Sequence, residues 1–535
     1  MVLAIAMLLQ SEALLAQSSN SGMSGGILWL FIIFMLIAIS LLIGDNMVRA
    51  QAKLGGIDVA RDDTSFFPGM NALLGKSRPA HIKDGSYTLL TKGHDIKLEG
   101  EADQVIRPIE VNTFGVCPTD YRGIAPIPKM VVELGQEVSA GDPLFFNKKT
   151  PDIQYVAPVS GEIAEIKRGA KRAIVEVVIL ADKQQTYRVL PSIDINTADR
   201  NDILNFLKGS GFWPSINQRP FDVVADPEIT PRDIFISTFD TAPLAADLNF
   251  IVDKKHTLFQ AGLDALSKLT DGDVHLGLDA RGNLPHAAFT NAKGVKKHWF
   301  KGKHPAGNVG IQIHHISPIK PGDVVWTLTV EDVLLLGELV ANHRFHAEQI
   351  VAITGNGIEQ RNYVRTMRGA KISDLLKNQS VDAHENRIIA GDVLSGRQVS
   401  MDGFLPNGEN QLTVIPEGRN YEMFGWLLPA IDRPTLSRTY PNFLFSDLAY
   451  EVDTNTHGEP RAFVQTGQYE AMMPASIYPQ HLMKAIMIQD FEKMEGLGLL
   501  ELSEEDVALC EFTCTSKQPL QQILREGLDL MREQG

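Results

Sequence analysis

Three histidines lie close together in one stretch of the chain, GKHPAGNVGIQIHHISPI, which covers residues 302–319. His304 precedes the adjacent pair His314 and His315 by ten residues. Imidazole nitrogens can bind a metal ion, but adjacent residues on a strand point to opposite faces, so the pair is poorly placed to share one ion. The glycines and prolines favour another interpretation, a glycine-rich turn that leads into a buried strand. We therefore expect a structural role for these histidines and no metal.

The stretch GSGFWP, residues 209–214, is the nearest match in the chain to a phosphate-binding loop. Such a loop needs several glycines directly before a helix, so that backbone N–H groups can approach an anion. This stretch supplies only Gly209 and Gly211, and the bulky Trp213 and Pro214 would occupy the space of the phosphates. The sequence therefore predicts no tightly bound nucleotide.

The three cysteines do not match a cluster-binding pattern. Cys510 and Cys514 are spaced so that a helix would place both thiols on one face, but an iron–sulfur cluster takes four ligands. Cys117 is distant in the sequence and would still leave one ligand missing. We expect no iron–sulfur centre in this chain.

His343 and His346 are one helical turn apart in NHRFHAE, with Glu348 beyond them, a spacing that is compatible with a metal site. No third histidine or second carboxylate completes the ligand set. A solvated helix end is therefore the preferred interpretation of this stretch.

The chain has 535 residues, enough for three or four domains at about 150 residues per domain. Its 44% hydrophobic and 21% charged residues are typical of globular proteins. The formal net charge of −15 argues against nucleic acid as a partner, because phosphate binding needs clustered Lys and Arg. The scarcity of cysteine fits a reducing compartment, so we expect most of the chain to lie in the cytoplasm.

Residues 25–44, GGILWLFIIFMLIAISLLIG, form a run without a charged side chain. About twenty apolar residues in a helix cross the hydrocarbon core of a membrane, so we predict one transmembrane helix in contact with lipid. The alternative is a buried core helix. Arg49, Lys53 and Arg61 follow the run, whereas no Lys or Arg precedes it. The positive-inside rule then predicts a single-pass protein with its N-terminus outside and its main body on the cytoplasmic side.

The segments that flank this helix have no strong periodic pattern. Residues 1–24 are interpreted as an exported N-terminal tail or a cleaved leader, although they lack the positive start of a secretory signal. Residues 45–86 are polar and interrupted by glycine and proline, so they are interpreted as a tether.

The domain at residues 87–195 contains short alternating apolar runs separated by glycine-containing turns, which is typical of small β-hairpins. This pattern resembles the barrel-sandwich domains that carry biotinyl or lipoyl groups. The predicted hairpin tip holds Lys148 and Lys149, but Pro151 follows instead of the usual carrier pattern. We therefore interpret the domain as an interaction module without a covalent cofactor.

Strands alternate with helices from residue 196 to residue 347, which predicts a parallel sheet. Residues 348–455 are expected to be rich in β-structure and residues 456–535 to be helical. The fold class is thus a multidomain α/β protein. The elements predicted within this part are a helix at 203–207 ended by Gly209, a strand at 234–238, a helix at 257–270, a strand at 273–279, a helix at 333–345 and a strand at 348–355.

Five longer stretches of the chain resemble one family. In order, they are GSGFWPSINQRPF, FISTFDTAPLAAD, KHPAGNVGIQIHHISPI, ENRIIAGDVLSGR and LGLLELSEEDVALCEFTC. They resemble the A subunit of the sodium-translocating NADH:quinone reductase, Na+-NQR, and the resemblance extends from about residue 91 to the C-terminus. The chain is more distantly similar to the C subunit of Rnf complexes and to the flavin- and NADH-binding subunit of complex I.

This resemblance implies a barrel-sandwich hybrid domain at 87–195, a Rossmann-like domain at 196–347, an SLBB-like β-grasp domain at 348–455 and a helical domain at 456–535. The distant relatives bind FMN through a loop with additional glycines, and they carry cysteine clusters. Since this chain has neither feature, we expect an inherited fold from which FMN and iron–sulfur clusters are absent.

The resemblance also implies membership of a six-membered complex of the bacterial inner membrane, with the other Na+-NQR subunits as partners. The complex is an NADH:ubiquinone reductase that couples quinone reduction to sodium export. In this family the A subunit has been associated with quinone, either ubiquinone or menaquinone, and it is not expected to be catalytic alone. The chain departs from the family in about ninety extra N-terminal residues, including 25–44, which we interpret as a built-in membrane anchor.

A quinone site would need apolar or aromatic walls and one or two polar groups. An alternative function is a membrane-anchored scaffold in the same complex that binds no quinone. Another is an electron-transfer C subunit of the Rnf type, which the missing cysteine clusters oppose. The residues predicted to line a quinone site are Gly209, Gly211, Phe212, Trp213, Asp240 and His304.

Overall fold

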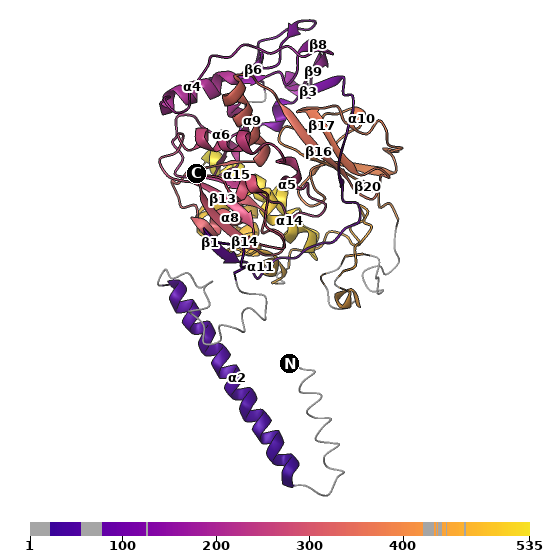
Figure 1. Cartoon of the computed structure of the whole chain (residues 1–535). Coiled ribbons are helices and arrows are strands. Elements are labelled where there is room, and N and C mark those ends of the chain that lie inside the picture. The colour runs from indigo at the N-terminus through magenta and orange to yellow at the C-terminus, as the bar shows by residue number, and fades with distance from the viewer. Residues whose placement is uncertain are drawn as a thin grey trace. The chain divides into compact units, whose positions relative to one another are not determined.

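The computed structural model divides the chain into two units, residues 1–80 and residues 81–535, and each is described here by itself (Figure 1). Part of the predicted tail or leader, residues 1–21, and most of the predicted tether, residues 55–77, lie outside the described residues. The residues that the structure describes are 22–54, 78–124, 127–420, 433–434, 436, 441–445, 447–464 and 467–534.

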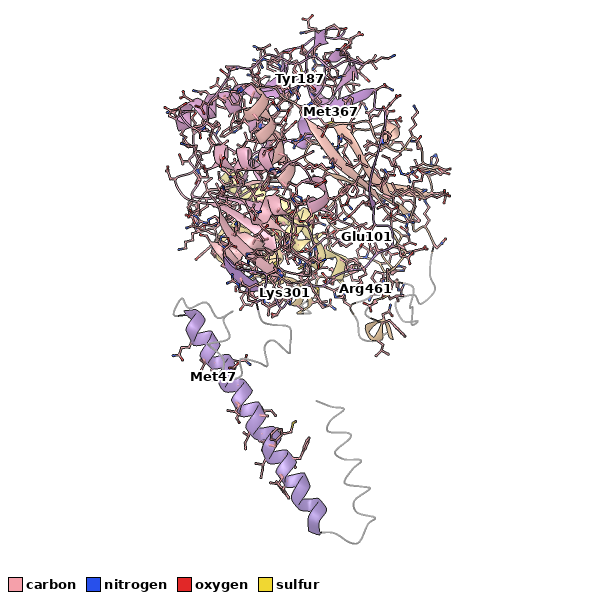
Figure 2. All side chains as sticks on the ribbon, in the orientation of Figure 1. Met47, Glu101, Tyr187, Lys301, Met367 and Arg461 are labelled. Carbon is pink, nitrogen blue, oxygen red and sulfur yellow. The ribbon has the colours of Figure 1, made fainter. Side chains whose placement is uncertain are left out.

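The first unit contains one long helix, α2 (Gly22–Leu54). Residues 29–48 within it are long and apolar enough to cross a membrane, and only 6% of this stretch is buried. Met47, which is 68% exposed, projects from the helix (Figure 2). The helix is longer than the predicted span, because the residues that follow, DNMVRAQAKL, include the good helix formers Ala, Met, Arg, Gln, Lys and Leu.

The second unit begins with two small sheets of mostly short antiparallel strands. Their core includes Phe145 and Tyr155, whose rings stack with centroids 5.0 Å apart. The β6–β7 hairpin places Lys148 and Lys149 at an exposed tip, as the sequence predicted. The strands are β3 (Thr113–Val116), β9 (Ile174–Ala181), β8 (Gly161–Arg168) and β5 (Glu137–Val138) in one sheet, and β4 (Lys129–Met130), β6 (Pro143–Asn147) and β7 (Thr150–Val156) in the other.

A seven-stranded sheet forms the centre of the second unit. Its first five strands are parallel, and the third, fourth and fifth have largely buried side chains, as expected where helices cover both faces. The strand order is β1 (Ser86–Leu89), β14 (Lys296–Lys301), β13 (Val274–Asp279), β12 (Ile234–Ser237), β15 (Val325–Leu328), β10 (Asn217–Arg219) and β11 (Val223–Val224). The accompanying helices are α4 (Arg200–Ser210), α5 (Leu248–Ile251), α6 (His256–Leu266), α7 (Ala287–Thr290), α8 (Val309–Ile316) and α9 (Val330–Asn342).

Two predictions of local structure in this region are wrong. The segment that contains His314 and His315 is the helix α8 and not a strand. The helix α9 ends at Asn342, and His343 adopts a left-handed backbone with φ of 50°, so His343 and His346 do not share a helical turn. In addition, Ser86, the last residue of the predicted tether, is the first residue of β1.

A six-stranded sheet follows, and it includes a strand from far upstream. The strand β2 (Asp103–Arg107) lies within the segment predicted as barrel, yet it pairs with β17 (Asn362–Met367). Such a pairing between distant segments leaves no local pattern in the sequence. The strand order is β19 (Arg397–Gln398), β18 (Asn386–Ala390), β20 (Gln411–Pro416), β16 (Glu348–Thr354), β17 (Asn362–Met367) and β2 (Asp103–Arg107), with the short helix α10 (Ile372–Leu375) beside them.

The C-terminal part of the chain, yellow in Figure 1, contains five α-helices of 5 to 15 residues in its described part. Their core residues, among them Met473, Leu482 and Leu524, form one cluster with Phe300 and Ala306 from the end of β14 and the loop that follows it. The helices are therefore attached to the central sheet through a shared core. They are α11 (Gln468–Met472), α12 (Pro479–Met487), α13 (Phe491–Gly496), α14 (Glu504–Thr513) and α15 (Leu520–Gln534).

Two glycines allow α6 and α9 to lie against each other. A Cβ at Gly337 would lie 1.9 Å from the carbonyl oxygen of Leu258, and a Cβ at Gly262 would lie 2.2 Å from that of Val333. No heavy atom can be accommodated at these distances. The close approach of the two helices therefore requires glycine on each of them.

We expect Gly337→Ala to destabilise the protein by about 1–3 kcal/mol, because the added methyl group overpacks the contact between α6 and α9. In a thermal unfolding experiment on the purified chain, the midpoint should fall by about 2 °C or more. Gly496→Ala is the matched control, since a Cβ there meets nothing within 4 Å. Equal midpoints for the two variants would contradict this view of the helix packing.

Candidate functional site

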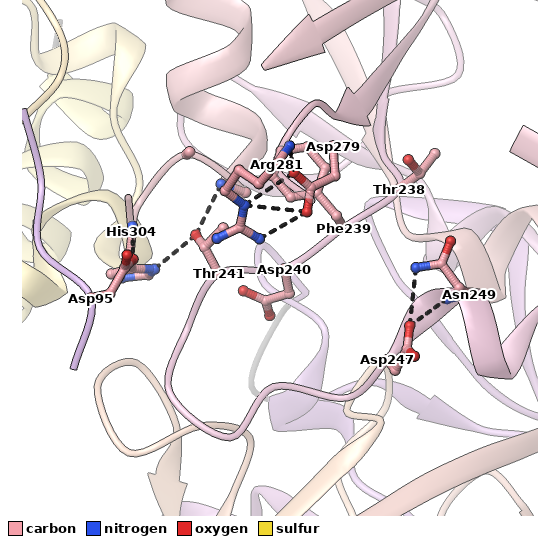
Figure 3. A network of polar contacts seen from close by, with 12 residues as sticks. Asp95, Thr238, Phe239, Asp240, Thr241, Asp247, Asn249, Asp279, Arg281 and His304 are labelled. Carbon is pink, nitrogen blue, oxygen red and sulfur yellow. Dashed lines mark hydrogen bonds and ion pairs between the residues drawn. The ribbon is translucent and has the colours of Figure 1, made fainter. Parts of the chain in front are cut away.

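The loops after β12, β13 and β14 leave the central sheet at the same edge (Figure 3). Ligands of open α/β sheets bind outside the carboxyl ends of the strands, which makes this edge the first place to look for a site. We call its polar residues the carboxyl-edge cluster. The cluster consists of Asp240, Thr241, Asp279, Arg281 and His304.

His304 is the most deeply buried member of the carboxyl-edge cluster, with 3% of its surface exposed. Its backbone N–H donates to Asp95 Oδ1 at 2.8 Å, and its Nδ1 lies 3.1 Å from Thr241 Oγ1. Thr241 Oγ1 already accepts a hydrogen bond from the N–H of Gly307, so its hydroxyl is free to donate to Nδ1. With the hydroxyl as the donor to Nδ1, the ring proton of His304 lies on Nε2.

Nε2 of His304 is buried and has no hydrogen-bond partner among the described residues. An unpaired buried donor is costly, and it is the kind of group that a ligand can satisfy. Burial also lowers the pKa of His304, although nearby carboxylates such as Asp240 act in the opposite direction. We therefore describe His304 as a neutral hydrogen-bond donor.

Asp240 and Arg281 bring opposite charges to the same edge. The side chain of Asp240 is accessible to solvent, but the protein that surrounds its carboxylate partly desolvates it. This desolvation raises the pKa of Asp240, and the negative charge of Asp392 raises it further. Arg281 is held by Asp279 through three contacts, Nε to Oδ1 at 3.0 Å, Nε to Oδ2 at 3.2 Å and Nη2 to Oδ2 at 2.9 Å. The guanidinium also lies 5.6 Å from the ring centroid of Phe239.

The helix α8 is fixed to this edge by Gln312. Its Nε2 donates to Ser237 Oγ at 2.8 Å and to the carbonyl of Ala306 at 3.2 Å. A Cβ at Gly277 would lie 1.9 Å from Gln312 Oε1, so glycine is needed on β13 for the helix to approach. The glycine-rich stretch that follows His304 thus serves to bring α8 close to the strands.

The other four residues predicted for the site are at a different place. Trp213 Nε1 donates to the carbonyl of Ala225 at 2.7 Å, and its ring packs edge-on against Trp326 at 5.3 Å. Trp326 pairs with Ile234 at the amino end of β12, whereas Asp240 follows its carboxyl end.

Phe212, like Trp213, is fully buried. Gly211 ends α4 with φ of 85° and packs against Val156, whereas a Cβ at Gly209 would meet nothing within 4 Å. The structure brings together only Asp240 and His304 of the six predicted residues. The polar residues that sequence reasoning missed, Thr241 and Arg281, could have been found by their position directly after buried strands.

Several of the other histidines and cysteines noted in the sequence have protein partners. His314 Nδ1 lies 2.8 Å from Glu501 Oε2, and its Nε2 accepts a hydrogen bond from the N–H of Ser476. His315 Nε2 lies 2.7 Å from the carbonyl of Pro474. These contacts agree with the predicted structural role, but they depend on the C-terminal segment, which the sequence did not indicate.

Cys510 and Cys514 are both buried against Tyr469. The hydroxyl of Tyr469 donates to Cys514 Sγ at 2.7 Å, and Cys510 Sγ lies 3.6 Å from the carbonyl of Tyr469. Burial raises the pKa of Cys510 above its ordinary range, so this thiol is protonated at neutral pH. His346, for its part, contacts the hydroxyl of Tyr187 at 2.8 Å.

A depression of about 510 Å³ lies on the C-terminal helices and shares no residue with the carboxyl-edge cluster. It is wide open, and its wall is mixed in chemistry. Its lining residues are Tyr478, His481, Lys484, Ala485, Ile488, Lys493 and Leu497.

A buried ion pair connects the central sheet to the C-terminal helices. Arg219 Nη1 lies 3.1 Å from Asp506 Oδ2, and the two side chains are 3% and 0% exposed. Arg219 Nη2 also reaches Glu505 Oε1 at 2.9 Å. Asp506 accepts a hydrogen bond from the N–H of Ser503 at the start of α14, so one carboxylate serves both the helix end and the ion pair.

Comparison with known proteins defines the class of this chain. Three family models match it, described as the NqrA N-terminal barrel-sandwich hybrid domain at residues 88–182, the NqrA second alpha/beta domain at 198–345 and the NQRA C-terminal domain, of the SLBB type, at 350–401. The protein is thus a multidomain α/β protein with barrel-sandwich and SLBB domains, as the sequence predicted.

Named relatives identify the family more closely. The A subunit of the Na(+)-translocating NADH-quinone reductase of Serratia proteamaculans is 35% identical over 456 residues, which cover 83% of this chain and 99% of the relative. The corresponding proteins of Neisseria meningitidis and Vibrio atlanticus carry the same name and are 35% and 34% identical to this chain. These alignments also cover 83% of this chain and 99% of the relative. The chain therefore belongs to the NqrA family, the A subunits of the Na+-translocating NADH-quinone reductase.

A solved structure of NAD+-reducing [NiFe]-hydrogenase aligns with 56% of this chain at 12% identity. Its TM-score of 0.28 is too low to indicate a shared overall fold.

We expect Asp506→Asn to lower the stability of the protein by about 3–5 kcal/mol, because it leaves the guanidinium of Arg219 buried without its main counter-charge. The purified chain should unfold at a lower temperature, and its C-terminal helices should be cleaved sooner in limited proteolysis. Asp253→Asn is the control, since that carboxylate is 54% exposed and an exposed pair contributes at most about 1 kcal/mol. If the Asp506→Asn variant unfolds at the same temperature as the control and is cleaved at the same rate, the proposed role of this ion pair is disproved.

Proposed function

We propose that this chain serves as the A subunit of a sodium-pumping NADH:quinone oxidoreductase complex and takes part in quinone reduction coupled to sodium export. The observation that carries this proposal is the length of the match, since relatives with this name align over 99% of their own residues. A match of this extent includes every domain of the relative. The partners would be the five other members of a six-membered complex.

We further propose that the parallel sheet and its helices form a Rossmann-like domain and that α11 to α15 form a helical domain packed on it. The parallel strands β12, β13 and β14 support the first assignment. Most residues of the core cluster that also includes Phe300 and Ala306 come from the C-terminal segment, which supports the second.

The long helix α2 is proposed to anchor the protein in the bacterial inner membrane through residues 25–44, which would contact lipid. Its apolar stretch, residues 29–48, is about 30 Å long at 1.5 Å per residue, which matches the thickness of a hydrocarbon core. Arg49 and Lys53 follow it, and positive charge favours the cytoplasmic side. The N-terminus would then be outside and the second unit in the cytoplasm.

We expect Ile37→Arg combined with Leu41→Arg to release the chain from the membrane when it is produced without other subunits. Each charge near the middle of the bilayer costs about 2.5–3.5 kcal/mol. The measurement is the fraction of protein that stays in the membrane pellet after alkaline extraction. Met47→Arg, at the polar end of the apolar stretch, should remain in the pellet. Retention of the double variant would rule out the proposed anchor.

The carboxyl-edge cluster is proposed to contact the headgroup of ubiquinone or menaquinone. The buried Nε2 proton of His304 has no protein acceptor among the described residues, and a quinone carbonyl is an acceptor of suitable size and charge. Arg281 would add positive charge near the same carbonyl. Phe239, which stacks under the guanidinium, would supply an aromatic surface.

FMN and iron–sulfur clusters are proposed to belong to other subunits. Two observations support this part of the proposal. Trp213 and Phe212 fill the core beyond α4, where a phosphate-binding loop would need open space. Cys510 and Cys514 are buried and engaged with Tyr469.

In the assembled complex, we expect His304→Leu to raise the KM for quinone about three- to tenfold, because one hydrogen bond of about 0.5–1.5 kcal/mol is lost. A photoreactive quinone analogue should label this chain in the wild-type complex and label it less in the variant. His304→Gln, which keeps a side-chain N–H at similar reach, should restore part of the affinity. His256→Gln, at an exposed residue of the same domain, is the control.

An unchanged KM together with labelling confined to other subunits would favour the scaffold alternative, in which this chain orders its neighbours and binds no quinone. Iron or flavin retained by the purified chain would instead favour an electron-transfer role of the Rnf type.

A further inference from the structure

A second group of polar residues lies at the opposite edge of the same sheet, at the amino ends of β12 and β13. Asp233 precedes β12, Asp273 precedes β13, and His275 is the second residue of β13. One potential metal-ligand atom from each residue lies within 4.8 Å of the other two. His275 Nε2 is 3.3 Å from Asp233 Oδ1, which is close to the separation of two ligands on a tetrahedral zinc ion.

The two carboxylates are already oriented by neighbouring groups. Arg232 Nε lies 2.9 Å from Asp233 Oδ2, and Lys296 Nζ lies 2.6 Å from Asp273 Oδ2. Both cations contact Oδ2, whereas Oδ1 of Asp233 accepts the N–H of Asp273 at 3.1 Å and lies 3.3 Å from His275 Nε2. A carboxylate oxygen has a second lone pair for an ion, and the two positive charges reduce the repulsion between the carboxylates before an ion binds.

His275 is oriented by a chain of hydrogen bonds on its other side. Its Nδ1 lies 2.9 Å from His298 Nε2, and His298 Nδ1 lies 2.7 Å from Ser86 Oγ on β1. A histidine that binds a metal nearly always donates its second ring N–H to a neighbouring acceptor. With Nε2 on an ion, Nδ1–H of His275 would donate to His298, and Nδ1–H of His298 would donate to Ser86.

Two of the three proposed ligand residues are shielded from solvent, and the third is open to it. Asp233 and His275 are buried, whereas the side chain of Asp273 is 44% exposed and leaves a route for an ion from solvent.

We propose that Asp233, Asp273 and His275 bind one divalent cation of the zinc class, with water at the fourth position. One imidazole nitrogen and two carboxylate oxygens suit Zn2+ and its first-row neighbours, whereas Mg2+ and Ca2+ prefer oxygen ligands alone. The ion would join the starts of β12 and β13 and, through His298 and Ser86, stabilise the pairing of β1 with β14. This site is separate from the carboxyl-edge cluster and does not depend on quinone binding.

The direct test is a titration of the full-length chain, purified in detergent without a metal-binding tag and freed of metal with a chelator. Calorimetry with ZnSO4 should detect one site per chain. We expect Asp273→Asn and His275→Gln each to weaken the binding at least about tenfold, since removing a ligand should cost no less than removing its supporting partner. His256→Gln, which changes an exposed histidine of the same domain, should leave the affinity unchanged.

The absorption spectrum of bound Co2+ is a second measurement. It would not respond to these substitutions if the residues had only a structural role. Co2+ in a four-coordinate site gives visible absorption bands, and these should form with one equivalent of Co2+ and shift in His298→Gln. Because Asp273 is partly exposed, Asp273→Asn should keep the wild-type unfolding temperature without metal. No binding of Zn2+ to the wild-type chain, or wild-type affinity in a folded Asp273→Asn variant, would overturn the proposal.

Discussion

The parallel alignment of three neighbouring strands determines where chemistry can occur in this protein. In β12, β13 and β14, Ser237 pairs with Gly277, and Gly277 pairs with His298. Because the strands run in the same direction and share this register, all their following loops meet at one edge and all their preceding segments meet at the other. The carboxyl-edge cluster and the group at the amino ends both result from this one arrangement.

Glycine at a few positions makes this arrangement compact enough to orient polar side chains. A Cβ at Gly307 would lie 2.8 Å from the backbone nitrogen of Thr241, so the loop after β14 can touch the loop after β12 only because glycine is there. The same contact lets the N–H of Gly307 reach Thr241 and thereby fixes the ring of His304. The orientation of one buried histidine therefore depends on backbone packing several residues away.

The sequence predicted the elements whose pattern is local. The helix expected near 203–207 is α4, and the strand expected at 234–238 is β12, because apolar spacing suffices to mark them. The predicted helix end at Gly209 is wrong, since α4 continues to Ser210 and Gly211 caps it. The segment VGIQIHHI misled the prediction, since Val309, Ile311 and Ile313 alternate as in a strand. It is helical because Gln312 and the neighbouring glycines attach it to β12 and β13. Strand pairings and ion pairs between segments far apart in the sequence could not be predicted from local patterns.

Nothing near Ser86 indicates that β1 will extend the central sheet, and nothing near Arg219 indicates Asp506 as its partner. The same limit affected the candidate site. Asp240 and His304 lie at the same edge of the sheet, whereas Trp213, which the sequence grouped with them, packs near the amino end of β12. Their role in a quinone site stays a prediction. The chain keeps the domains of its family, and we propose that it works through neighbouring subunits. The most direct test is to purify the full-length chain from its native membrane in mild detergent, identify what accompanies it by mass spectrometry, and measure sodium-stimulated NADH:quinone reductase activity. We expect membrane-embedded, flavin-containing partners and an activity that is lost when this chain is removed. A chain that purifies alone, from a preparation whose activity persists without it, would contradict the proposed function.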